Sequence, residues 1–278
     1  MLQPEKLASE RIRLKGGLEI PVLGLGTFES EGQEVTHVVR SAIELGYRHI
    51  DCAQAYWNQE LVAPGLKAAP REDLWVTSKL WRGDYTTEKV PEACDRCLRE
   101  LDTPYLDLWL IHWPDRTVPI EETLEAMQKC KEQGKVRAIG LSNCTIRHLK
   151  DAMATGVEFV MNQIEFHPYL RQPELYDFCR ANGITVTAYS PLARGKATKD
   201  AVLAAIGKKH GKTAAQVAVR WALQQDVVVL AKTIHVERLT ENADVFDFEL
   251  TPEEMVQITA LDEGLRTIYP DFNEFDYK

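Results

Sequence analysis

The segment that decides the fold is Tyr105-Leu106-Asp107-Leu108-Trp109-Leu110-Ile111-His112, an apolar run that ends on a histidine. Two earlier runs of the same kind end on Asp51 and Lys79, and Tyr56 follows Asp51 by five residues. Adjacent parallel strands present their carboxyl ends on one side of a sheet. These four polar side chains are therefore expected to meet. A carboxylate, a phenol, an amine and an imidazole brought together form a site that can donate a proton.

Strand and helix patterns alternate eight times along the chain. Apolar runs bounded by Gly, Pro or charged residues predict strands at about 22–28, 47–51, 74–80, 105–113, 136–142, 159–166, 184–190 and 227–232. The segments between them carry apolar residues at helical spacing, and one of these follows a Thr213-x-x-Gln216 capping box. Near-continuous apolar strands are typical of a parallel sheet that is covered on both faces.

Eight such units form either a closed barrel or an open doubly wound sheet, and the strand ends distinguish the two. Six consecutive strands end in polar or aromatic side chains, at Asp51, Lys79, His112, Asn143, Gln163 and Tyr189. Distant strands of an open sheet cannot share a site, whereas a barrel gathers all its strand ends around one mouth. We therefore predict an α/β fold, a (β/α)8 TIM-type barrel, with residues 1–278 as one domain. An N-terminal β-hairpin at about 12–20 and two extra helices at about 200–210 and 252–262 complete the prediction.

Composition limits the possible partners. The net charge of −9 is spread along the helical segments, which argues against nucleic acid as a partner because a basic face would be needed. The first residues lack the apolar core of a signal peptide, and no run approaches the roughly 18 apolar residues of a membrane span. We expect a monomeric, soluble, cytoplasmic protein whose partner is a small molecule.

The six cysteines are expected to be reduced and mostly buried. Cys94 and Cys97 form a CxxC pair, but they lie on the apolar helical stripe of Val90, Leu98 and Leu101. No second CxxC and no histidine pair completes a zinc site. We therefore predict no metal.

From Gly24 to Phe248 the chain resembles the aldo-keto reductases. The resemblance rests on motifs that match in order and spacing: Asp51-x-x-x-x-Tyr56, Thr77-Ser78-Lys79-Leu80-Trp81, Leu110-Ile111-His112-Trp113-Pro114, Ile139-Gly140-Leu141-Ser142-Asn143, Asn162-Gln163-Ile164-Glu165-x-His167-Pro168, Tyr189-Ser190-Pro191-Leu192, and Lys232-Thr233 followed by Arg238 and Glu241-Asn242. The loops after His112 and Pro191 are short, as in the microbial members that reduce 2-oxoaldehydes and diketo-gluconate.

The four polar residues suit the reduction of a carbonyl group. Hydride transfer builds negative charge on the carbonyl oxygen, so a proton donor is needed. A free phenol, with a pKa of about 10, holds its proton tightly. We expect Lys79 to lower the pKa of Tyr56, Asp51 to keep Lys79 charged, and a neutral His112 to orient the carbonyl. Each residue alone is more often structural, but together at successive strand ends they favour catalysis.

The cofactor implied by the resemblance is NADPH. Gly24-x-Gly26 lacks the third glycine of a dinucleotide-binding fingerprint, so a Rossmann site is excluded. The resemblance implies that nicotinamide stacks on Tyr189, while two cations and a hydroxyl at the end of the chain's last strand hold a 2′-phosphate. As an alternative, those two cations are ordinary solvated charges. The implied cofactor positions are Gly26, Thr27, Ser142, Asn143, Gln163, Tyr189, Ser190, Leu192, Lys232, Thr233, Arg238, Glu241 and Asn242.

Four aromatic residues are expected to wall an open, shallow substrate pocket: Phe28, Trp57, Trp81 and Trp113. The resemblance implies reduction of aldehydes or ketones, namely small 2-oxoaldehydes, keto sugars or keto acids. Trp57 stands where the family commonly has glycine and could intrude on the mouth.

Two alternatives stay open at this point. The same barrel could serve a non-catalytic, NADPH-binding structural or accessory protein, since fold alone does not fix activity. It could also carry a Schiff-base aldolase with Lys79 as nucleophile, although pairing with Asp51 would keep that amine protonated. The complete set of four residues favours the reductase.

Overall fold

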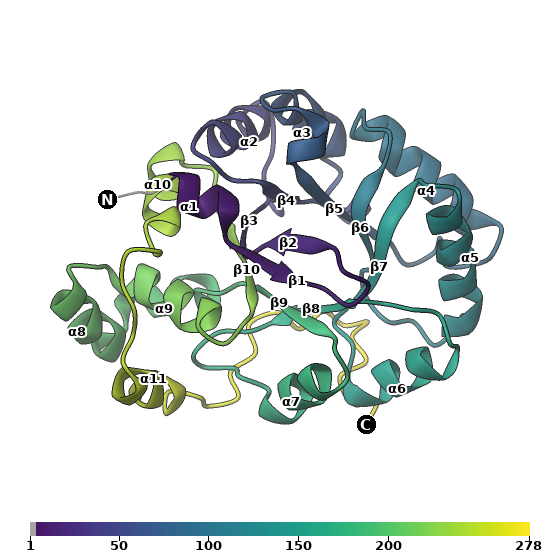
Figure 1. Cartoon of the computed structure of the whole chain (residues 1–278). Coiled ribbons are helices and arrows are strands. Elements are labelled where there is room, and N and C mark those ends of the chain that lie inside the picture. Colours follow the sequence, from purple (N-terminus) through teal and green to yellow (C-terminus); the bar gives the residue numbers. More distant parts are fainter. Residues whose placement is uncertain (1–3) are drawn as a thin grey trace.

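A closed barrel of eight parallel strands forms the centre of the molecule. The computed structural model describes residues 4–278, and the strand order around the barrel is β10-β3-β4-β5-β6-β7-β8-β9 (Figure 1). The strands are β3 (Leu23–Gly26), β4 (His49–Asp51), β5 (Trp75–Leu80), β6 (Leu106–Ile111), β7 (Val136–Ser142), β8 (Met161–Glu165), β9 (Thr185–Tyr189) and β10 (Val228–Lys232). The predicted (β/α)8 barrel is confirmed. Several strands are shorter than expected. The loops at the barrel mouth take the last residues of the runs at 22–28, 105–113, 159–166 and 184–190, whereas β4, β5 and β10 end as expected but begin one or two residues later.

One helix follows each barrel strand and covers its outer face. These helices are α2 (Glu34–Glu44), α3 (Gln59–Leu66), α4 (Lys89–Glu100), α5 (Ile120–Glu132), α6 (Ile146–Ala154), α7 (Pro173–Ala181), α9 (Ala214–Leu223) and α10 (Val236–Ala243). The two extra helices are confirmed as α8 (Ala201–His210) and α11 (Pro252–Thr259). A short helix not expected from the sequence, α1 (Pro4–Ser9), lies before the first strand.

The predicted N-terminal hairpin closes one end of the barrel. Strand β1 (Arg11–Arg13) pairs with β2 (Glu19–Pro21) in antiparallel fashion, and the pair crosses the ring of strands in Figure 1. Leu14 and Ile20 are buried against Trp75, Leu108 and Met161 in a core cluster of their own. Apolar contacts thus plug this end and leave the opposite end for the site.

The larger core cluster lies between the strands and the helices. Cys94 and Cys97 belong to it, as their helical spacing predicted, and the six cysteines are all buried and unbridged. Inside the barrel, space is tight at Gly24, where an added Cβ would lie 2.7 Å from Nδ1 of His49. Any larger residue there would force that buried histidine to move.

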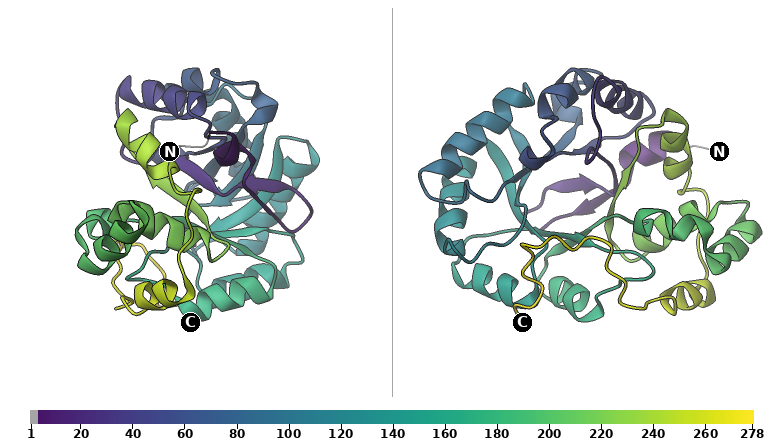
Figure 2. Two further views of the ribbon diagram at one scale, coloured as in Figure 1. Left: turned by 60° about the vertical axis from the view of Figure 1, so that its left-hand side comes forward. Right: turned by 180° about the vertical axis from the view of Figure 1, so that it is seen from behind.

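The strand register brings the carboxyl ends of the barrel strands together. Asp51 pairs with both Gly26 and Thr77, and Gln163 pairs with Ser142. The C-terminal segment, yellow in Figure 2, crosses the face opposite to the hairpin, as the view from behind shows. Among residues 4–278, no helix combines the length and apolar content needed to cross a lipid bilayer.

Candidate active site

Four polar side chains from three neighbouring strands lie together at the barrel mouth. Asp51 ends β4, Tyr56 ends the short 3-10 turn Gln54–Tyr56 that follows it, Lys79 lies in β5, and His112 comes directly after β6. Asp51, Lys79 and His112 are all buried. The barrel therefore brings together the four residues that the sequence analysis singled out.

Lys79 connects the other members of this group. Its Nζ forms an ion pair with Oδ1 of Asp51 and donates hydrogen bonds to the Cys52 carbonyl at 2.9 Å and to the Tyr56 hydroxyl at 3.1 Å. The Lys79 side chain has no solvent exposure. A buried ammonium that donates three hydrogen bonds is fixed in position and keeps its charge.

The pKa values of this group follow from burial and from the Lys79 charge. Burial favours the neutral amine, but Asp51 and Tyr56 together raise the pKa of Lys79 above its usual value. Burial also raises the pKa of Tyr56, and this outweighs the lowering by Lys79. The expectation of a net lowered phenol pKa is thus wrong, because it left desolvation out. Tyr56 holds its proton at neutral pH.

His112 is neutral at ordinary pH. Burial, and then the nearby Lys79 charge, keep the pKa of its imidazole well below the usual value. Its ring meets Tyr56 edge-on with centroids 5.6 Å apart, and it meets Trp81 in the same way at 5.2 Å. A neutral imidazole beside the Tyr56 hydroxyl can hydrogen-bond an uncharged carbonyl oxygen.

A second group of polar side chains lies beside the first and is bonded to it. Gln163 donates a hydrogen bond to Oδ2 of Asp51 at 2.9 Å, and Asn143 donates one to the His112 carbonyl at 3.0 Å. The Tyr189 hydroxyl donates to Oδ1 of Asn143 at 2.6 Å, and Ser142 donates to the Gln163 carbonyl at 2.8 Å. The expected carboxamide-binding residues and the expected stacking ring are therefore contiguous with the proton-donating group.

The mouth above these residues is aromatic. Phe28 packs on Tyr56 with ring centroids 5.1 Å apart, while Trp81 and Trp113 both contact Phe272 edge-on, at 5.7 and 5.6 Å. Trp57 differs from the other three expected wall residues, because the residue is 88% exposed and its backbone has a left-handed φ of 55°. In this structure it projects into solvent instead of packing at the mouth.

Comparison with known proteins identifies the family to which this site geometry belongs. A model of the Aldo/keto reductase family matches residues 22–263. The chain belongs to the aldo/keto reductase family. It is 43% identical over 261 residues to glyoxal reductase of Bacillus subtilis, a match that covers 92% of this chain and 94% of that protein. The protein is therefore an enzyme, an oxidoreductase that reduces carbonyl groups with NAD(P)H.

Solved structures of other reductases share the same barrel. The aldose reductase of Schistosoma japonicum aligns with a TM-score of 0.89 and 36% identity, and the alignment covers 93% of this chain and 94% of that chain. A structure described as a putative 2,5-diketo-D-gluconic acid reductase B aligns with a TM-score of 0.88 and 41% identity over 91% of this chain and 92% of that one. The second of these fits the short-loop microbial reductases that the sequence resembles.

The cations expected to meet a nucleotide phosphate lie at the rim of the reductase barrel. Lys232 ends β10 and Arg238 lies in α10, and both are exposed. Within residues 4–278 neither forms an ion pair. Thr233 is buried, and its hydroxyl accepts a hydrogen bond from the His235 amide at 2.9 Å. Two uncommitted cations near a hydroxyl fit a phosphate group.

The remaining expected cofactor residues flank these two groups. Thr27 donates to the Asp51 carbonyl at 3.0 Å, and Ser190 has a left-handed φ of 50° at the turn after β9. Leu192 packs on the core, and Asn242 is buried in α10. Glu241 accepts a hydrogen bond from Thr213 at 2.8 Å and so joins α10 to α9. Gly26 pairs with Lys232 across β3 and β10, so Lys232 lies at the same end of the barrel as the mouth.

Sequence reasoning missed two residues of the reductase mouth. Asn58 donates hydrogen bonds to the carbonyls of Thr27 at 2.8 Å and Ser30 at 3.0 Å, and thereby fixes the loop that carries Phe28. Phe272 comes from a C-terminal segment outside the β/α repeat. Its only sequence signal was the run of aromatic residues after position 268. That run does not indicate that the segment folds back over the barrel mouth.

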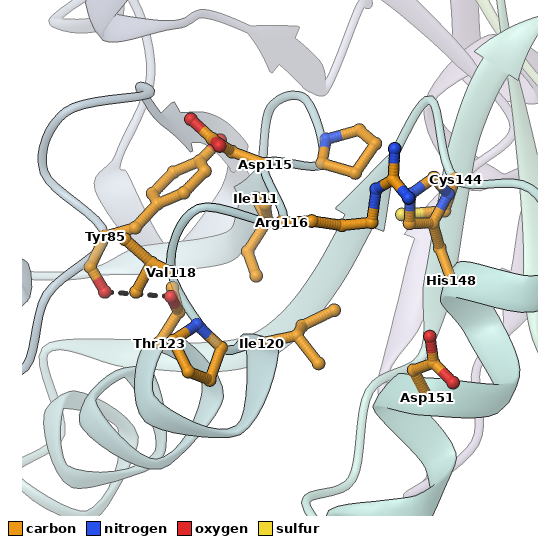
Figure 3. A pocket seen from close by; sticks show the side chains of 12 residues that line it. Tyr85, Ile111, Asp115, Arg116, Val118, Ile120, Thr123, Cys144, His148 and Asp151 are labelled. Carbon is orange, nitrogen blue, oxygen red and sulfur yellow. Dashed lines mark hydrogen bonds between the residues drawn. The ribbon is translucent and has the colours of Figure 1, made fainter. Parts of the chain in front are cut away.

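A cavity of about 130 Å³ lies behind the loop that follows β6 (Figure 3). Arg116, Cys144 and His148 are among the side chains that line it, and none of the four mouth residues Asp51, Tyr56, Lys79 and His112 does. In its wall, Tyr85 donates to the Trp113 carbonyl at 2.6 Å. This bond holds the loop that carries Trp113 from the side away from the mouth.

Proposed function

We propose that this chain reduces small uncharged aldehydes, in particular 2-oxoaldehydes, with NADPH as the cofactor and Tyr56 as the proton donor. The observation that carries the proposal is the hydrogen bond of 3.1 Å from Lys79 to the Tyr56 hydroxyl, beside a neutral His112. It supports a phenol that holds its proton until negative charge develops on the substrate oxygen.

Tyr56 transfers its proton to the carbonyl oxygen as that oxygen becomes negative. A bound dihydronicotinamide would supply the hydride to the carbonyl carbon. An alkoxide is more basic than a phenolate, so the proton moves downhill even from a phenol whose pKa is raised by burial. The phenolate left behind is stabilised by the Lys79 ammonium, which Asp51 holds in place.

His112 positions the substrate. As a neutral imidazole it can donate one hydrogen bond to the carbonyl oxygen without competing with Tyr56 for the proton. Asn143 fixes the backbone at this residue through its bond to the His112 carbonyl. We infer that Ser142, Asn143 and Gln163 hold the nicotinamide carboxamide, and that Tyr189 stacks on its ring.

Three residues at the barrel rim favour NADPH over NADH. Lys232 and Arg238 are exposed and unpaired within the described residues, and Thr233 adds a hydroxyl. A 2′-phosphate can form charge-assisted hydrogen bonds with these groups, whereas the hydroxyl of NADH cannot.

The mouth favours uncharged substrates over keto acids. Its walls are aromatic, and the guanidinium of Arg82, which lies over the Phe272 ring, is paired with Asp115 at 2.9 Å. Lys79 is buried and paired with Asp51. A substrate carboxylate would therefore have to displace an existing ion pair, which costs more than burying an apolar group. The likeness to glyoxal reductase supports the same substrate class.

A panel of carbonyl compounds tests this proposal through oxidation of NADPH, followed by absorbance, with NADH in parallel. Methylglyoxal and phenylglyoxal should give a higher kcat/KM than 2-keto acids and keto sugars, and NADPH should outperform NADH. A preference for keto acids would contradict the substrate class. Equal rates with both nucleotides would contradict the cofactor assignment while leaving the reductase activity in place.

A further inference from the structure

Two carboxylates, those of Glu165 and Glu274, anchor the C-terminal strap, residues 265–277, to the barrel. The strap is also held by hydrogen bonds from the Leu265 amide to the Tyr169 carbonyl at 2.9 Å and from the Tyr277 hydroxyl to Asp151 at 2.8 Å. Near its start, Glu165 at the end of β8 accepts hydrogen bonds from the amides of Thr267 at 2.8 Å and Ile268 at 3.2 Å. The Glu165 side chain has no solvent exposure. This first anchor lies two residues after Gln163, so the strap leaves the barrel beside the inferred carboxamide site.

The second anchor is the carboxylate of Glu274. It accepts hydrogen bonds from the backbone amide of Arg116 at 3.2 Å, from its Nε at 3.0 Å, and from Nε2 of His148 at 2.9 Å. The Glu274 side chain is only 14% exposed. Arg116 belongs to the loop after β6 and His148 to α6, and both line the cavity of Figure 3. One carboxylate thus joins the strap to two barrel elements.

The hydrogen bonds of His148 define its role in this anchor. Its Nδ1 accepts from the Thr145 amide at 3.2 Å, so the ring proton lies on Nε2 and is donated to Glu274. Thr145 also caps α6 and donates to the Tyr277 carbonyl. The second anchor therefore extends to the start of α6, two residues after Asn143.

Between the two anchors the strap carries one wall of the mouth. Phe272 contacts Trp81 and Trp113 edge-on, and Arg82 lies over its ring at 4.8 Å. The described chain has no helix or strand after Thr259, so regular backbone hydrogen bonds do not hold this segment. Phe272 keeps its place through its ring contacts, a hydrogen bond of 3.4 Å from Arg82 to its carbonyl, and the two carboxylate anchors.

We propose that Glu274 is a positioning residue for carbonyl reduction, because its carboxylate holds the strap so that Phe272 stays against Trp81 and Trp113. This proposal rests on the proposed function, in which those aromatic side chains wall the substrate pocket. Substrates with a large apolar group use the Phe272 wall, whereas the smallest 2-oxoaldehydes do not reach it. Glu274 therefore selects among aldehydes without touching them.

The variant Glu274→Gln tests the role of the carboxylate with little change of shape. We expect kcat/KM for phenylglyoxal to fall by about tenfold, mainly through KM, since a charged acceptor of three hydrogen bonds is removed. For methylglyoxal the change should stay below about twofold, because this smaller substrate does not touch the wall that the substitution loosens. The matched control is Asp271→Asn, which makes the same charge change on an exposed strap residue and should alter neither value.

A double variant separates positioning from general destabilisation. If Glu274 acts through Phe272, adding Glu274→Gln to Phe272→Ala should lower kcat/KM for phenylglyoxal no further than Phe272→Ala alone. If kcat/KM of the double variant fell below that of Phe272→Ala by the factor seen for Glu274→Gln alone, the proposal would be overturned.

Hydrogen exchange of strap amides provides a readout that does not depend on activity. It should accelerate in Glu274→Gln with no change in global unfolding, and an unchanged exchange rate would also overturn the proposal. Failure of the wild type to reduce any aldehyde would instead refute the proposed function, and the exchange result would still stand.

Discussion

Two polar layers inside the same barrel differ in charge although the same strands supply them. The upper layer holds Asp51 of β4 and Lys79 of β5 as an ion pair at the mouth. The lower layer holds His49 and Thr77, each two residues earlier on the same strand, joined by a hydrogen bond of 3.1 Å. Residues two positions apart point to the same side of a strand, so both layers face the interior. The upper layer is charged and the lower one is neutral.

The environment of each layer explains this difference. Burial, and then the Lys79 charge above it, lower the pKa of His49 to about 3. The hairpin plugs the barrel below, and Gly24 leaves no spare volume beside the imidazole. The upper layer instead opens toward the aromatic mouth, where a substrate can reach Tyr56. We therefore propose that the upper layer serves chemistry and the lower layer serves packing, in line with the general division between the two ends of such barrels.

The largest expected effect is on the upper layer, in Tyr56→Phe. Removing the phenolic hydroxyl deletes the proposed acid but keeps the ring, so kcat should fall by about 10²- to 10⁴-fold. Steady-state kinetics measure this change, while NADPH binding and the melting temperature should stay close to those of the wild type. Near-normal turnover would remove Tyr56 as the proton donor.

Lys79→Met should lower both the activity and the stability, and so tests whether the charge of the upper layer has a structural role as well as a chemical one. The change leaves the buried Asp51 carboxylate without its partner, so the free energy of unfolding should fall by about 3–5 kcal/mol. Chemical denaturation measures the loss. Adding Asp51→Asn should recover part of the stability but none of the activity. If stability were unchanged in Lys79→Met, the ion pair would not be the structural centre of the upper layer.

The neutral His49 of the lower layer should make the stability of the protein depend on pH. His49 has a pKa of about 3 in the folded protein and about 6.5 when unfolded, so the unfolded state binds the proton more readily. Its contribution is present above pH 6.5 and is lost as the pH falls toward 3, by about 1.4 kcal/mol per pH unit. Chemical denaturation between pH 6.5 and 4 gives the free energy of unfolding at each pH. The slope of this free energy against pH should differ by this amount between the wild type and His49→Gln. Parallel slopes would mean that His49 is already charged in the fold.

The smallest effect is expected at the exposed rim, in Arg238→Ala. Loss of one charge-assisted hydrogen bond to a 2′-phosphate should weaken NADPH binding by about ten- to a hundredfold. NADH binding should hardly change, and the NADPH effect should shrink as salt is raised. Fluorescence titration of both nucleotides decides between the outcomes. Equal losses for NADPH and NADH would assign Arg238 to the fold or to the adenine, not to the phosphate.

The order of the barrel elements and the four polar residues of the mouth were determined by the sequence alone. Apolar periodicity is local, so it indicated eight strands, their helices, the hairpin and the two extra helices without knowledge of their packing. The residues at the strand ends then followed from topology, because a closed parallel barrel leaves only one place for them. Asp51, Tyr56, Lys79 and His112 could be named for this reason.

Only the tertiary structure decided how these residues behave. The net pKa of Tyr56 depends on how deeply the ring is buried, and the bond from Gln163 to Asp51 spans 112 positions in the chain. Phe272 reaches the mouth through a segment without regular structure, fixed by Glu165 and Glu274. These features depend on contacts between residues that are far apart in the sequence. Such contacts produce no periodic pattern from which they could be predicted. Local patterns therefore predicted where the site lies, and packing decided its protonation and its walls.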